Sequence, residues 1–141
     1  MHKRGHPASP GNLEQGRLEQ AEHAFRRAIA LTRACDDRTG EAFTQLGLAE
    51  TLVSQGNGDH AEALLHDLVH TAQRLGHQFL RARSLLALGH LTASRGNHVA
   101  AASDLAGSAA IFERCGIPPW QARALESLAA ARAAGGREAD R

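Results

Sequence analysis

Apolar residues recur along this chain every three or four positions, which is the spacing of helices that each bury one side. The first stripe of this kind consists of Ala21, Phe25, Ala28, Thr32 and Cys35. The second consists of Ala42, Gln45, Ala49 and Leu52, with Leu48 beside it. Short segments rich in Gly, Asp, Asn and Pro separate the stripes. The pattern predicts six helices, over 17–35, 39–55, 58–75, 79–95, 97–115 and 119–134.

Glycines at a constant interval of forty residues divide this pattern into units: Gly16, Gly56, Gly96 and Gly136. Small residues recur at the same interval, as Ala21, Ala61 and Ala101 in one column and as Ala49, Gly89 and Ala129 in another. Each unit therefore predicts a pair of antiparallel helices, a back helix and then a front helix. We expect the two columns of small residues to face each other, so that the helix axes approach closely.

The composition favours an all-α fold. The chain has 28 alanines and 18 leucines, but three isoleucines, three valines and no tyrosine. Strands favour β-branched and aromatic residues, whereas helices favour Ala and Leu. These numbers argue against a sheet protein.

Charge, apolar runs and cysteine content bear on the kind of partner and on where the protein works. The net charge is +1, which gives no electrostatic reason to expect nucleic acid or a membrane surface as a partner. No apolar run reaches the roughly 18 residues of a membrane helix, and the first residues lack the apolar segment of a signal peptide. Two cysteines are too few for a disulfide framework. We predict a cytoplasmic protein.

The spacing within each unit resembles the tetratricopeptide repeat. The pair Leu88-Gly89 is followed by Gly96, Ala101 and Leu105 at the intervals of that family. The units are longer than the family's usual repeat of about thirty-four residues. In this respect residues 16–136 are similar to the MalT-like repeat region of bacterial transcriptional regulators of the LuxR and antibiotic-regulatory types. The resemblance implies a right-handed α-solenoid of antiparallel helix pairs.

The domain organisation follows from the residues that the repeats cover. Residues 1–15, rich in Pro and Gly, predict a disordered N-terminal tail, 16–136 the repeat domain, and 137–141 a short C-terminal tail. The first back helix has no front helix before it, and the last front helix has no back helix after it. We therefore expect a fragment, or a stand-alone remnant, of such a regulator. No phosphate-binding loop or DNA-reading module is recognised in the chain.

The resemblance also implies a concave groove lined by the front helices. The groove-facing candidates are Phe43, Leu46, Glu50, Arg83, Leu86, His90 and Arg123. Arg83 and Arg123 occupy one column, one repeat apart, and two such guanidinium groups can clamp a carboxylate by bidentate hydrogen bonds. The alternative is that both are ordinary solvated arginines.

Two other groups of residues have side chains capable of chemistry. Glu62, His66 and His70 share one helix face at a spacing that zinc ligands can use, but equivalent positions in the other units suit a solvated face. Cys35 and Cys115 fall on a predicted buried stripe, too far apart for a disulfide. No catalytic residue, metal site or cofactor is predicted.

The sequence therefore favours a non-enzymatic module that binds a protein or peptide segment in the groove, or senses a ligand, for a regulator. The alternative is a self-assembly or docking element that uses its terminal helices. These carry Leu18, Phe25, Ile29 and Leu31 at one end and Trp120, Leu125 and Leu128 at the other. A metal-binding protein based on histidine is a remote third.

Overall fold

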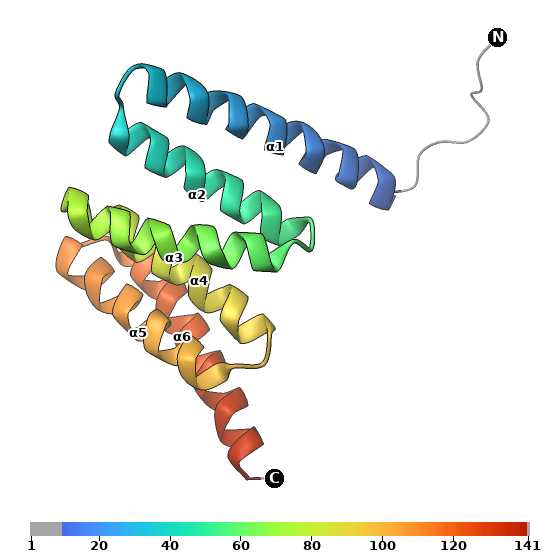
Figure 1. The fold of residues 1–141 in the computed structure, drawn as a ribbon. Helices are drawn as coiled ribbons and strands as arrows, with labels where there is room; N and C mark the ends of the chain where they lie inside the picture. The colour runs from blue at the N-terminus through green and yellow to red at the C-terminus, as the bar shows by residue number, and fades with distance from the viewer. Residues whose placement is uncertain (1–9, 141) are drawn as a thin grey trace.

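The computed structural model describes residues 10–140, and these form six α-helices and no strand. The helices are α1 (Pro10–Ala34), α2 (Arg38–Ser54), α3 (Gly58–Leu75), α4 (Gln78–Ser94), α5 (His98–Cys115) and α6 (Pro118–Ala139). Each helix packs against the next one in the chain, and the stack runs from α1 at one end to α5 and α6 at the other (Figure 1). The prediction of an all-α chain is confirmed.

The turns between the helices share one geometry and recur every twenty residues. A left-handed residue follows each of the first five helices: Asp36, Gly56, Gly76, Gly96 and Gly116, with φ of 56°, 81°, 67°, 86° and 68°. The residue after it donates its backbone N–H to a carbonyl five positions earlier, as His77 does to Ala72 at 2.9 Å. This is the hydrogen bond of a Schellman motif, and glycine adopts the required φ without steric cost.

The same turns start the following helix. The Asp37 carboxylate accepts the N–H of Gly40 at 2.9 Å, and the Asn97 side chain accepts the N–H of Ala100 at 3.3 Å. Such caps satisfy N–H groups that have no partner inside the helix. Because each turn ends one helix and starts the next within three residues, consecutive helices run antiparallel.

One close contact between helices lies where α4 meets α5. A Cβ atom added to Gly89 would lie 2.7 Å from the Leu105 side chain and 3.5 Å from the Ala101 carbonyl oxygen. All three residues are buried. The predicted close contact between Gly89 and the start of the next back helix is therefore confirmed.

The even-numbered helices share one side of the stack. α4 contacts both α2 and α6, whereas α1, α3 and α5 do not contact one another within residues 10–140. The predicted front helices, α2, α4 and α6, therefore lie next to one another on one side of the stack.

Two helix limits differ from the prediction. α1 begins at Pro10, so residues 10–15 of the predicted tail are helical, and α6 continues to Ala139 through Gly135 and Gly136. Gly16 and Gly136 do not end helices, because neither has the positive φ found at the turns. A glycine inside a helix costs only about 1 kcal/mol relative to alanine. The rest of the predicted N-terminal tail, residues 1–9, lies outside the described residues, as does Arg141.

The predicted burial fails at Cys35, Cys115 and Ala129 and holds only in part at Ala21. Cys35 and Cys115 are both exposed, because each stands at the end of its helix where the chain turns away. Ala129 is exposed and Ala21 is half-buried, whereas Ala49, Ala61, Gly89 and Ala101 are buried as predicted. The reason is the position of α1 and α6 at the ends of the stack, where no further helix of the described chain covers them.

Candidate binding surface on α2, α4 and α6

The seven groove candidates separate into three groups by exposure. Glu50, His90 and Arg123 are exposed, and Phe43 and Arg83 are half-buried. Leu46 and Leu86 are only 1% and 4% exposed, so the prediction that they line an open groove is wrong. The reason is that adjacent front helices contact each other and cover the middle of this side. Glu126 occupies the repeat position of Leu46 and Leu86 on α6, and it is exposed.

The structure brings the two predicted arginines together on a tryptophan. The guanidinium carbon of Arg83 lies 4.5 Å from the centroid of the Trp120 ring, and that of Arg123 lies 4.7 Å from it. Both distances are within the range of a cation–π interaction. Arg83 comes from α4, and Arg123 and Trp120 come from the first two turns of α6. The indole thus holds two positive charges near each other.

An aromatic cluster fixes the position of this indole. The Trp120 ring stacks on Phe112 with centroids 5.7 Å apart, and its edge-to-face neighbour Phe79 is 6.0 Å away. Phe79 in turn lies 6.3 Å from Phe43, and Phe43 meets His77 at 5.1 Å. Offset and edge-to-face contacts at these separations are favourable. The cluster therefore connects α2, α4, α5 and α6 at one end of the surface.

Sequence reasoning included Phe43 in the site but missed Phe79, Phe112 and Trp120. A signal was present, because the front helices carry aromatic residues within their first six positions: Phe43, Phe79 and Trp120. The repeat positions of Phe79 and Trp120 differ by one residue, and that of Phe43 differs from theirs by three or four, so a search by forty-residue columns does not align them.

The two arginines differ in their electrostatic surroundings. Arg83 donates to the Glu50 carboxylate at 3.3 Å and so has a partner on α2. Arg123 makes no ion pair with any carboxylate of the described chain. The surface around Trp120 therefore carries one compensated and one uncompensated guanidinium group. Of the two, Arg123 is the one available to an anionic group of a partner.

A second polar contact lies farther along the same side. Nε2 of His90 is 2.7 Å from Oγ of Ser127, which connects α4 to α6. His90 as a whole residue is exposed, but the protein atoms around its ring desolvate it and lower the pKa of His90 below its ordinary value. The nearby Glu50 carboxylate opposes that shift only in part. His90 is therefore neutral at pH 7 and can donate or accept a hydrogen bond there.

His90 lines two hollows. One of about 190 Å³ is lined by Glu50, Val53, Ala87, His90, Leu91 and Ser94. Another of about 320 Å³ is lined by His90, Ala93, His98, Leu105, Ser127, Ala130, Ala131 and Ala134. Both have apolar walls with a few polar atoms, which is the character of small side-chain pockets rather than of a cofactor site.

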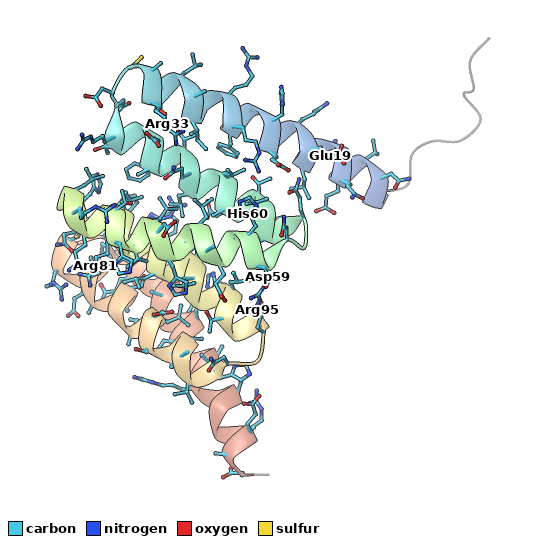
Figure 2. All side chains as sticks on the ribbon, in the orientation of Figure 1. Glu19, Arg33, Asp59, His60, Arg81 and Arg95 are labelled. Atoms are coloured by element: carbon cyan, nitrogen blue, oxygen red, sulfur yellow. The ribbon has the colours of Figure 1, made fainter. Side chains whose placement is uncertain are left out.

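The histidines considered as metal ligands lie elsewhere and do not converge. His66 and His70 are exposed on α3, and the Glu62 carboxylate accepts a hydrogen bond from Arg95 at 3.2 Å. Figure 2 shows Arg95 next to Asp59 as well, and that pair is 2.7 Å apart. No group of three or more His, Cys, Asp and Glu side chains that could hold a metal ion occurs within 10–140.

Comparisons with known proteins add no family assignment. No family model matches the chain, and no curated protein matches it at a significant level. Within the described helices, none is long and apolar enough to cross a membrane.

Proposed function

We propose that this chain is a non-enzymatic interaction module whose surface of α2, α4 and α6 binds an acidic segment of a partner protein. In this proposal the six helices are tetratricopeptide-like repeats of forty residues, wound as a right-handed α-solenoid. The module works in the cytoplasm as part of a bacterial transcriptional regulator, and the regulator's DNA-reading function belongs to other modules. It needs no metal or cofactor.

The observation that carries this proposal is the placement of Arg83 and Arg123 on the Trp120 ring. An arginine held on an aromatic face keeps its N–H donors in a fixed plane, and that plane matches a carboxylate. Arg123 is exposed and lacks a carboxylate partner among the residues described. A partner's Asp or Glu can therefore add a hydrogen-bonded ion pair there without first displacing another acid.

The repeated turns support the proposed repeat architecture. The left-handed residues at 56, 76, 96 and 116 are all glycines at a constant separation of twenty residues. Equal turns at equal intervals stack equivalent helices in equivalent positions, which is how repeat proteins build an extended binding surface.

The chain offers a direct probe of this surface, because Trp120 is its only tryptophan. A peptide of alternating Glu and Ala should change the Trp120 fluorescence on binding, and the peptide with Gln in place of Glu should not. Binding should weaken as salt is raised, since exposed charges are screened beyond about 10 Å at 0.1 M. The titration yields the dissociation constant at each salt concentration.

Charge reversal identifies the residues responsible. Arg123→Glu should weaken binding of the acidic peptide at least about tenfold, which corresponds to about 1.4 kcal/mol. Arg83→Glu together with Arg123→Glu should abolish binding, while circular dichroism shows unchanged helix content. Arg114→Glu is the matched control, because Arg114 is an exposed arginine on α5. Equal affinity for the Glu and Gln peptides, or equal losses in Arg114→Glu and Arg123→Glu, would refute the proposal.

A further inference from the structure

We propose that the chain associates head to tail with second copies of itself, with α6 of one copy packing antiparallel against α1 of the next. α1 and α6 lie at opposite ends of the stack (Figure 1). In this contact α6 of one copy would take the place that α4 has inside one chain, and α1 of the next copy would take the place of α5. This inference is independent of the proposed binding of an acidic segment.

The contact between α4 and α5 shows what such an interface requires. Leu85 of α4 lies over Gly107, where an added Cβ would be 3.7 Å from its side chain. Ile111, one turn farther along α5, is only 3% exposed. Small residues at Ala82 and Gly89 let the two helices approach, and both are buried.

α6 repeats the α4 side of that contact, forty residues later in the sequence. Leu125 stands at the position of Leu85 and is 47% exposed. Ala122 and Ala129 stand at the positions of Ala82 and Gly89, and both are exposed. α6 therefore presents a leucine between two small residues, with no described helix covering it.

α1 repeats the α5 side, eighty residues earlier in the sequence, except at the position of Gly107, where α1 has the exposed Arg27. Leu31 stands at the position of Ile111, yet it is 64% exposed rather than 3%. Ala28 stands at the position of Ser108, whose hydroxyl donates to the Ala82 carbonyl at 2.8 Å. That hydrogen bond is not essential to the packing of a back helix on a front helix. At the same repeat position α3 has Leu68, which has no hydroxyl and is buried.

The lengths of the two terminal helices give independent support. α1 has 25 residues and α6 has 22, whereas the four helices between them have 17 or 18. Relative to the other repeats, the additional turns lie at the N-terminal end of α1 and at the C-terminal end of α6. In an antiparallel contact these two ends lie side by side. The additional turn of α1 carries Leu13, which is exposed.

A contact between two different faces of one molecule is heterologous and does not close on itself after two copies. Sedimentation velocity from about 10 µM to about 1 mM should therefore show a series of growing species rather than a single dimer. Leu31→Glu should block the α1 face, and Leu125→Glu should block the α6 face. Each substitution should weaken association at least about tenfold.

Mixing the two variants provides the decisive experiment. The Leu31→Glu chain keeps an intact α6 face and the Leu125→Glu chain keeps an intact α1 face, so an equimolar mixture should form a heterodimer and nothing larger. Val99→Glu is the control, because Val99 is 81% exposed on α5, outside both faces; it should associate as the unaltered chain does. Circular dichroism of each variant checks that the fold is retained.

Three results would overturn the inference. The first is an unaltered chain that stays monomeric at the highest concentration. The second is a mixture of the two folded variants that stays monomeric while the unaltered chain associates. The third is a loss of association in Val99→Glu as large as in the two leucine variants.

Discussion

Replacing Gly89 by alanine tests the close contact between α4 and α5. Two effects of opposite sign act at this position. Alanine favours the helix over glycine by about 1 kcal/mol. The added Cβ, however, would lie 2.7 Å from both Cγ and Cδ2 of the buried Leu105 side chain, and crowding of this kind in a packed core costs about 1–3 kcal/mol. We expect Gly89→Ala to destabilise the protein by about 0–2 kcal/mol.

Gly107→Ala supplies the matched control within the same pair of helices. Gly107 lies in the interior of α5, and a Cβ there would be 3.7 Å from Leu85, an ordinary contact distance. The alanine therefore gains helix propensity without crowding, and we expect stabilisation of about 0.5–1 kcal/mol. Because propensity is common to both variants, the difference between them, about 1–3 kcal/mol, measures the crowding at Gly89.

Urea denaturation followed by circular dichroism measures both free energies of unfolding. Trimming Leu105 to alanine in the Gly89→Ala background should cost less than the same change in the unaltered chain, because the added Cβ fills part of the space. If Gly89→Ala stabilises the protein as much as Gly107→Ala does, the contact is not tight and the packing argument is wrong.

Two further predictions concern titration and reactivity. Desolvation lowers the pKa of His90 in the fold, so below about pH 6.5 the unfolded chain takes up this proton more readily and stability falls as the pH falls. His90→Gln should reduce the loss of melting temperature between about pH 7 and pH 5; an identical pH dependence in both proteins would contradict this. Cys35 and Cys115 are exposed, so a colourless disulfide reagent should titrate both thiols without denaturant, and a titre that rises only in urea would show them to be buried.

Much of the fold was predictable because its determinants are local. Helix periodicity and the glycines at 56, 76, 96 and 116 placed most helix limits within two residues. The wrongly predicted helix limits are those that were placed by a glycine which does not adopt a positive φ in the fold. Gly16 and Gly136 occupy the repeat column but stay helical, since a glycine ends a helix only when the chain adopts the left-handed conformation there.

The candidate surface was harder to predict, because it depends on how helices sit beside one another. The resemblance placed Leu46 and Leu86 in an open groove, but contacts between α2, α4 and α6 bury them. Arg83 and Arg123 were found by their shared column. Their meeting point, Trp120, was missed because an aromatic contact across two helices has no signature in the forty-residue repeat.

The constant spacing of the turns makes it possible to lengthen this chain by duplicating a helix pair. Asn57 follows one left-handed glycine, and Asn97 follows another forty residues later, with the same backbone hydrogen bonds on both sides. A tandem duplication of residues 57–96 would join the two copies at a junction that the protein already contains. The chain can thus be lengthened by whole helix pairs, each adding one front helix to the side formed by α2, α4 and α6, without designing a new connection.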